Sequence, residues 1–596
     1  MAAAAAADVK LHSFLQWLQP TAATSAAARS APAAARASAS SPPPPSPPPP
    51  MVFTPLLPPL PRVGRRALTR GDAGVVMVVP LDLAITPMRV LQDPLVGPRC
   101  RALFEEGAVD DRLLVILFLV AERLRPGSLW KPYLDMLPST FGSSVWFTDE
   151  ELAELEGTTL HRATVIQRKS LQTLFDGKVK GLVEELLHVD GSGSSAEVSF
   201  QDFLWANSIF WTRALNIPLP HSYVVPGSSC DEQQTRMGDD CPSNQVLARN
   251  SEETDCTAKN SRVDENPKSS NMESIWVEGL VPGIDFCNHT RFYSPDVKAL
   301  ATWEVDSMGN TTGVPASMYL MLADKTSVEA GAEIYINYGN KGNERTTVPL
   351  CVYLQELLYL YGFVIDNNPD DYLMVHYPVE ALRQVQCADI KMKLLEIQKG
   401  ELRCLLPRSL LDNGFFGIRS NEDKDKKKNT SHFSSYSWSG LRKVPSYLHK
   451  IVFPQEFMST LRTIAMQEHE IERVALLLGE GASSEDREPS DEEVQSAIWE
   501  VCGDHGALGL LVDLLTVKMA ELEEGTGTEA SDSQLLEKFN SIDSEDSISG
   551  SDEDNKNRSK RNGRSCIVYR RGQKQLTRSF LREAEYLLEL AAKEDT

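Results

Sequence analysis

Three short segments in the middle of this chain constrain its fold more than any other feature. The first reads Gly-Ile-Asp-Phe-Cys-Asn-His over residues 283–289, and the second reads Glu-Ile-Tyr-Ile-Asn-Tyr-Gly-Asn-Lys-Gly-Asn over residues 333–343. The third, Tyr-Gly-Phe, occupies residues 361–363. Strand-like runs at residues 301–305, 318–322 and 334–336 lie among them. The combination of these three segments in this order is specific enough to indicate one protein family.

The three segments resemble the core of SET-domain protein methyltransferases, in the branch typified by the Rubisco large-subunit lysine methyltransferase. In that branch an Asp-x-x-Asn-His segment threads beside a Tyr-Gly-x-Lys-x-Asn segment and a Tyr-Gly-Phe segment. Residues 130–133, Trp-Lys-Pro-Tyr, are similar to its Trp-x-Pro-Tyr hallmark. The resemblance covers roughly residues 75–590 and is less specific in the second half. It implies an α+β fold, a SET-domain β-clip with an inserted helical subdomain, followed by an all-α substrate-binding domain.

The chain, at 596 residues, is longer than a single hydrophobic core supports, so we expect at least two folded domains. We predict a low-complexity Ala/Ser/Pro-rich region at 1–62, where the proline tract at 41–50 is a spacer. The catalytic domain is predicted at 63–366 with a helical insert at about 100–280, in which residues 228–272 form a solvated loop. A helical substrate-binding domain at 367–594 carries a disordered acidic insert at about 525–563.

Local patterns place several elements. The β-branched run at 75–79 predicts a strand, and residues 110–125 and 200–215 predict helices. The patterns Thr-Asp-Glu-Glu at 148–151 and Ser-Asp-Glu-Glu at 490–493 are capping boxes that begin further helices, the second running toward residue 522.

Charge and cysteine content exclude several classes of protein. A formal net charge of −23 disfavours direct nucleic-acid binding. The ten cysteines form no Cys-x-x-Cys pair, so we predict reduced thiols and no metal site. The longest apolar run, residues 113–121, is far shorter than the ~20 residues that span a bilayer, so no membrane association is expected.

The N-terminal composition bears on the compartment. Residues 9–71 contain no Asp or Glu and resemble an organellar transit peptide in composition. Residues 11–18, however, resemble the short helix that opens the catalytic domain in this branch, and a transit peptide would precede that helix. We therefore expect an intracellular protein of the cytoplasm or nucleus, with the chloroplast as the alternative.

The resemblance implies an S-adenosylmethionine-dependent protein-lysine N-methyltransferase that acts, as a monomer, on a lysine-containing protein substrate. Tyr338 matches the catalytic tyrosine, whose phenol aligns the methyl group and the target nitrogen. Asp285 would sit near the channel for the target side chain, and Tyr361 would form the aromatic wall of that channel.

The resemblance also implies the cofactor contacts. Asn288 and His289 match the Asn-His pair that holds the cofactor. Arg213 corresponds to the arginine of a Ser-Arg-Ala segment that approaches the cofactor carboxylate, a task that suits a guanidinium fork. Phe363 is expected to contribute to cofactor packing, and Gly64 would be the second glycine of a Gly-x-Gly turn.

Two departures from the pattern affect this assignment. Arg62 stands where the first glycine of the Gly-x-Gly turn belongs. Residues 345–355 interrupt the segment that joins the second and third motifs, and removing them restores an uninterrupted version. A retained intron or misassembled gene, a tolerated loop, and an isoform with a disabled site all explain that insertion. An error of the same kind also explains residues 19–62.

The motifs and the two departures from them are compatible with more than one function. The chain is a methyltransferase, or it is a catalytically impaired SET-fold binding or scaffold protein. Relatives in this branch include a histidine methyltransferase, so the motifs do not fix the target nitrogen. The substrate and the degree of methylation are not encoded in these segments.

Overall fold

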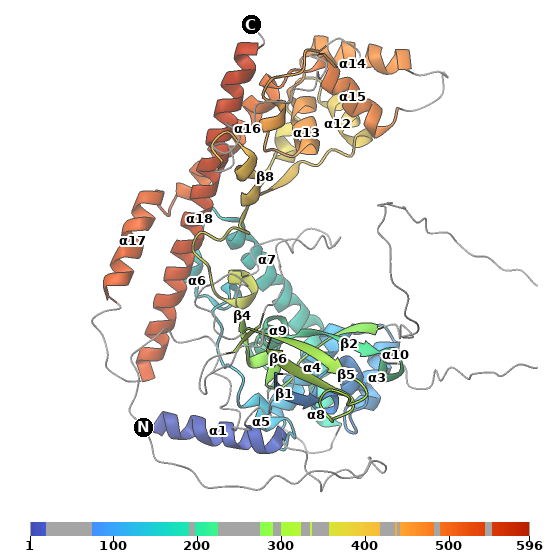
Figure 1. Ribbon diagram of the computed structural model, residues 1–596, viewed down its shortest axis with the longest axis vertical. Coiled ribbons are helices and arrows are strands. Elements are labelled where there is room, and N and C mark those ends of the chain that lie inside the picture. The colour runs from blue at the N-terminus through green and yellow to red at the C-terminus, as the bar shows by residue number, and fades with distance from the viewer. Residues whose placement is uncertain are drawn as a thin grey trace, which may run out of the picture. The chain divides into compact units, whose positions relative to one another are not determined.

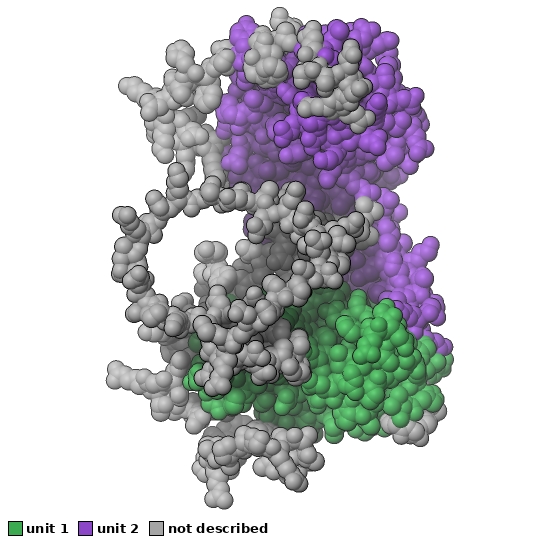
Figure 2. All heavy atoms as spheres, turned by 90° about the vertical axis from the view of Figure 1, so that its right-hand side faces the viewer, with its two compact units in different colours: residues 1–137, 181–337 green, residues 138–180, 338–596 purple. Residues whose placement is uncertain are grey.

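The computed structural model describes residues 2–18, 74–189, 197–224, 274–289, 300–322, 334–336, 357–417, 436–437, 442–481, 489–542 and 551–594. The chain divides into two compact units, residues 1–137 with 181–337 and residues 138–180 with 338–596 (Figure 2). This division places residues 138–180 and 338–366 in the second unit, whereas the sequence assigned both to the catalytic domain. Gly64, Tyr338, the insertion at 345–355 and the loop at 228–272 lie outside the described residues.

The first unit is built on a five-stranded sheet in the order β1-β6-β5-β7-β4. Strands β1, β6 and β5 are antiparallel, whereas β7 runs parallel to both β5 and β4. The strands span Val75–Pro80 (β1), Asn288–His289 (β4), Leu300–Asp306 (β5), Ser317–Leu322 (β6) and Tyr335–Ile336 (β7). A separate antiparallel pair joins β2 (Leu215–Pro220) to β3 (Ser274–Gly279). The sheet confirms the strand predicted at 75–79 and those at 301–305 and 318–322.

Helices surround this sheet (Figure 1). The apolar run that is too short for a bilayer lies inside α4, where residues 114–121 are all buried. The Asp110 carboxylate accepts a hydrogen bond from the Leu113 amide and so begins this helix, and Ser199 begins α9 with a capping box. The elements are α1 (Ala2–Leu18), η1 (Leu81–Leu83), α2 (Pro87–Leu91), α3 (Gly97–Glu105), α4 (Asp111–Leu124), α5 (Lys131–Leu134), α8 (Lys180–His188), α9 (Phe200–Arg213), α10 (His221–Val224) and η4 (Ile284–Phe286).

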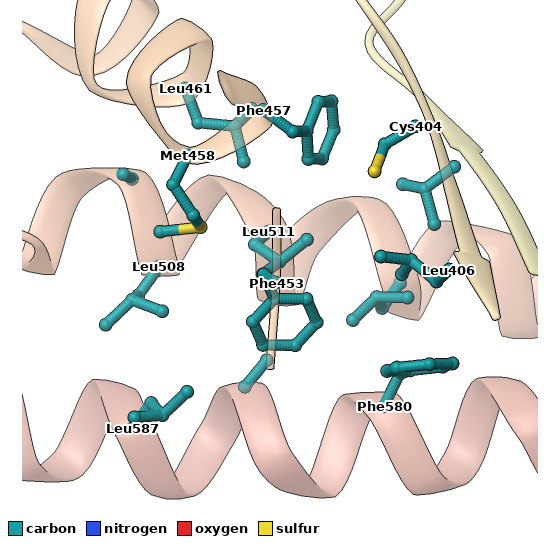
Figure 3. Close-up of a cluster of buried hydrophobic side chains, with 14 of the residues drawn as sticks. Cys404, Leu406, Phe453, Phe457, Met458, Leu461, Leu508, Leu511, Phe580 and Leu587 are labelled. Carbon is teal, nitrogen blue, oxygen red and sulfur yellow. The ribbon is translucent and has the colours of Figure 1, made fainter. Parts of the chain in front are cut away.

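The second unit is mainly helical. Its largest core packs α13, α16 and α18 together, and Figure 3 shows Phe453 and Leu511 between the helices. Its elements are η2 (Ser144–Trp146), α6 (Asp149–Ala153), α7 (Thr159–Leu174), η3 (Phe175–Val179), η5 (Leu357–Tyr361), β8 (Tyr372–His376), α11 (Val379–Leu382), α12 (Ala388–Ile397), β9 (Arg403–Pro407), η6 (Arg408–Asn413), η9 (Leu448–Lys450), α13 (Gln455–Ala465), α14 (Glu468–Gly481), α15 (Asp491–Val501), α16 (His505–Glu523), α17 (Glu529–Ile542) and α18 (Ser551–Glu594).

The predicted capping boxes begin α6 and α15 as expected. Other expectations for this half require correction. An antiparallel pair, β8 with β9, lies within the region predicted to be all-α. The helix expected from 490 toward 522 is interrupted at Cys502, which has extended backbone angles, and α16 begins after the buried Asp504, which accepts from Arg442 and Arg462.

The disorder predicted at 525–563 is wrong for the described residues there. Two helices, α17 and the start of α18, occupy most of that range, and Asp532 and Leu536 of α17 are buried. The acidic composition suggested solvation, but Asp532 is neutralised by Arg570 and Lys574 of α18. Composition alone does not reveal such a long-range partner.

Candidate active site

The end of the first sequence motif lies beside the described start of the second, residues 334–336, in the first unit. Strand β4 pairs with β7 in parallel, so that Asn288 lies opposite Tyr335 and His289 opposite Ile336. The chain reaches Tyr338 two residues after Ile336, outside the described part. The sheet therefore joins the Asp-x-x-Asn-His segment to the strand that leads to the predicted catalytic tyrosine.

Asp285 is the most enclosed polar group of this loop, with 3% of its surface exposed. Its carboxylate accepts a hydrogen bond from the Tyr133 hydroxyl at 2.6 Å and from the Gly283 amide at 3.0 Å. Arg213 Nη1 lies 3.7 Å from Oδ2 of the same carboxylate and donates to the Asp285 carbonyl oxygen at 2.9 Å. The motif loop is thus held by side chains from α5 and α9.

Burial controls the protonation of this group. Burial raises the pKa of Asp285 to about 6, although the Arg213 charge and the Tyr133 hydrogen bond favour the ionised form. Burial, followed by the Asp285 charge, raises the pKa of Tyr133 well above its ordinary value. At neutral pH the carboxylate is therefore the acceptor and the tyrosine the donor.

One nitrogen of the Arg213 guanidinium, Nη1, donates to Asp285, whereas the Nε–Nη2 edge is open within the described part of the chain. Its side chain is 1% exposed, and within the described part of the chain its Nε and Nη2 atoms have no hydrogen-bond partner. The guanidinium carbon lies 5.7 Å from the centroid of the Phe286 ring. Buried donors without partners are costly in a folded protein, and the planar Nε–Nη2 edge matches a carboxylate in a bidentate pair. The residues present therefore fit a ligand that brings a carboxylate to this point.

Aromatic rings fix the remainder of the loop. Phe286 stacks against Tyr133 at 6.1 Å between centroids and contacts Phe14 of α1 at 5.2 Å. Phe14 is fully buried, and Trp17 lies 5.7 Å from Trp130. Helix α1, which spans Ala2–Leu18, is therefore part of the first unit.

Two further predicted site residues of this unit, Asn288 and His289, lie on β4. Asn288 is half-buried on β4, and only the backbone of His289 is described. Cys287 is buried in the same loop. Among the described residues, no group of three His, Cys, Asp or Glu side chains is arranged to hold a metal ion.

Tyr361 and Phe363 belong to the second unit. Their rings lie 6.4 Å apart at an interplanar angle of 53°. Gly362 between them has φ of +78°, and a Cβ there would lie 2.5 Å from the backbone carbon of Gly142 and from the nitrogen of Ser143. The glycine of the third motif is thus required by the close approach of two backbone segments.

Replacing Gly362 with alanine is expected to destabilise the second unit by at least about 2 kcal/mol, because the positive φ and the backbone overlap act together. Gly479→Ala is the control, since nothing lies within 4 Å of a Cβ at that exposed helical position. Chemical denaturation would measure both variants. Equal stability of the two would contradict the role of the close approach.

Sequence reasoning missed the contacts made by Tyr133 and Phe14. Tyr133 was noted only as part of the Trp-Lys-Pro-Tyr segment, and nothing in that pattern points to a carboxylate 152 positions later in the chain. The presence of a tyrosine in a hallmark segment was the only available signal.

Similarity to known proteins supports a methyltransferase relationship. The chain is 34% identical over 154 residues to the Arabidopsis thaliana [fructose-bisphosphate aldolase]-lysine N-methyltransferase, chloroplastic. It is 32% identical over 154 residues to the Pisum sativum ribulose-1,5 bisphosphate carboxylase/oxygenase large subunit N-methyltransferase, chloroplastic. Each match spans 26% of this chain and 29% of the relative. Mouse actin-histidine N-methyltransferase is 28% identical over 42% of this chain and 30% of its own.

Among solved structures, the SET domain of LSMT bound to MeLysine and AdoHcy aligns with a TM-score of 0.49 at 18% identity. That alignment covers 88% of this chain and 84% of the other. No protein-family model matches the chain. The described helices and small sheets confirm the α+β class. Over the segment shared with the plant relatives, the chain resembles the Rubisco large-subunit branch of protein N-methyltransferases, as its motifs predicted.

Proposed function

We propose that this protein is an S-adenosylmethionine-dependent protein-lysine N-methyltransferase. The observation that carries the proposal is the open Nε–Nη2 edge of the buried Arg213, held beside the Asp285 loop. S-adenosylmethionine carries an amino-acid carboxylate that this edge would receive in a bidentate pair. The same loop continues into Asn288 and His289 on β4.

Different side chains bind the cofactor, contact the target side chain and align the reacting atoms. Arg213, Asn288 and His289 hold the cofactor, with Gly64 and Phe363 as further contacts. Asp285 and Tyr361 border the target side chain. Tyr338 aligns the target nitrogen with the methyl group, which is the main requirement of an in-line displacement.

S-adenosylmethionine supplies an electrophilic methyl group on a sulfonium: the S–CH3 bond breaks as the N–CH3 bond forms. The target amine must first release a proton to solvent. For a lysine of ordinary pKa this costs roughly 4–5 kcal/mol near neutral pH. A dry channel lined by aromatic rings lowers that cost, because desolvation disfavours the ammonium form.

We further propose that residues 63–366 carry catalysis and residues 367–594 grip a folded protein substrate, with the enzyme acting as a monomer and without nucleic acid. Fructose-bisphosphate aldolase and the Rubisco large subunit, named for the plant relatives, are the first substrates to assay. We propose a location in the cytoplasm or nucleus, with the plastid of the chloroplastic relatives as the alternative. Among the described helices, none has the length and apolar character to cross a membrane.

Two alternatives have specific support. The match to mouse actin-histidine N-methyltransferase favours histidine as the target nitrogen. Arg62 at the first glycine position and the insertion at 345–355 favour a catalytically impaired scaffold.

Calorimetry with S-adenosylmethionine tests the proposal on the full chain and on a variant that lacks residues 345–355. We expect binding by both, because the Arg213 edge lies outside the insertion. Methylation of the two candidate substrates would then be compared with a Tyr338→Phe control. Binding by the shortened variant alone would mark the insertion as disabling, and failure of both to bind would favour the scaffold.

A further inference from the structure

We propose that Tyr133 is a positioning residue for the cofactor carboxylate: its hydroxyl holds Asp285, and Asp285 keeps the free edge of Arg213 open to the ligand. The inference rests on the proposed function, because it assigns a carboxylate-bearing ligand to Arg213.

The three side chains form a continuous buried chain of contacts. Tyr133 on α5 donates to Oδ2 of Asp285 at 2.6 Å, and that oxygen lies 3.7 Å from Arg213 Nη1. Arg213 Nη1 is already committed to the Asp285 carbonyl oxygen at 2.9 Å. The Tyr133 hydroxyl therefore satisfies an oxygen that, within the described part of the chain, would otherwise have only the guanidinium as a near donor.

Loss of the Tyr133 hydroxyl changes the hydrogen bonding between Asp285 and Arg213. A buried carboxylate oxygen that has lost its hydrogen bond attracts the nearest remaining donor, because a buried charge without a hydrogen-bond partner is costly. Among the described residues, the next donor near Oδ2 is Arg213 Nη1, at 3.7 Å. Arg213 would then move toward Asp285, and its Nε–Nη2 edge would no longer face an incoming carboxylate.

The hydroxyl can be removed while the ring stays in place. The Tyr133 ring stacks on Phe286 with an interplanar angle of 15°, and phenylalanine preserves this contact. Tyr133→Phe therefore retains the ring that packs the loop, so that the variant is expected to fold.

Tyr447 provides a matched control in the second unit. It is also buried, its hydroxyl donates to Asp504 Oδ2 at 3.3 Å, and Asp504 also pairs with arginines, Arg442 and Arg462. Tyr447→Phe removes the same chemical group from a similar environment that the proposal does not connect to the cofactor.

The experiment compares two ligands by calorimetry on the full-length wild type, Tyr133→Phe and Tyr447→Phe. S-adenosylhomocysteine carries the amino-acid carboxylate, whereas 5′-methylthioadenosine lacks it. We expect Tyr133→Phe to weaken S-adenosylhomocysteine binding about 10-fold, the effect of one charge-assisted hydrogen bond, and to leave methylthioadenosine binding within about 2-fold of wild type. Tyr447→Phe should leave both affinities unchanged.

Two other outcomes would overturn the inference, and a third would overturn the proposed function. Equal weakening of both ligands by Tyr133→Phe would show a general structural role and overturn the inference. Unchanged binding of S-adenosylhomocysteine by Tyr133→Phe would overturn it as well. Failure of the wild type to bind either ligand would instead overturn the proposed function on which it rests.

Discussion

Replacing Arg213 with lysine is expected to weaken S-adenosylhomocysteine binding about 100-fold while the protein remains folded. Lysine preserves the positive charge beside Asp285 but replaces a planar fork of donors with a single ammonium. The bidentate pair with the ligand carboxylate is lost, and charge-assisted hydrogen bonds of this kind account for an effect of that order. Calorimetry at constant ionic strength would measure the change.

Arg462→Lys is the control for this substitution. Arg462 is as deeply buried as Arg213 and pairs with Asp504 at 2.8 Å in the second unit. It should lose stability but keep wild-type affinity for the ligand. If Arg213→Lys bound S-adenosylhomocysteine as tightly as Arg462→Lys does, the open edge of Arg213 would not be the carboxylate site.

The sequence predicted elements whose determinants are local. The strand at β1 follows from its β-branched run, and α4, α6 and α15 follow from capping residues that bond to amides three positions later. The pairing of β4 with β7 agrees with the family pattern that places the first two motifs side by side. The strand and the capped helices depend on short spacings that are visible in one sequence, whereas the pairing of β4 with β7 is implied only by the resemblance.

What the sequence did not predict depends on contacts between distant positions. The Tyr133 hydroxyl and the Asp285 carboxylate meet across 152 residues. The buried Asp504, between α15 and α16, accepts from arginines of two other segments. A charged residue in a polar segment looks solvated until its partners are known, which is why residues 529–542 were assigned to a disordered insert.

Asp532→Asn is expected to destabilise the second unit by roughly 3–5 kcal/mol, the cost of breaking a buried ion pair by removing one partner. The Asp532 side chain is fully buried and accepts from Arg570 Nε at 2.8 Å and from Lys574 Nζ at 2.7 Å. The asparagine leaves both cations buried without their shared counter-charge. Denaturant unfolding of the full chain would measure the loss.

The same variant should show a specific dependence on pH. Burial lowers the pKa of Lys574, whereas the hydrogen bond and charge of Asp532 raise it. Without Asp532 that pKa falls further below the unfolded value. Between the two pKa values the unfolded chain binds more protons, so stability rises with pH. The loss in free energy of unfolding of Asp532→Asn relative to wild type should therefore be largest near neutral pH and should decrease as the solution is made alkaline.

Two comparisons decide how this result is interpreted. Asp513→Asn changes an exposed acid on α16 and should alter stability by no more than about 0.5 kcal/mol. Adding Lys574→Met to Asp532→Asn removes one uncompensated cation and should recover part of the loss. If Asp532→Asn were instead as mild as Asp513→Asn, the ion pairs of Asp532 with Arg570 and Lys574 would not contribute to the stability of the second unit.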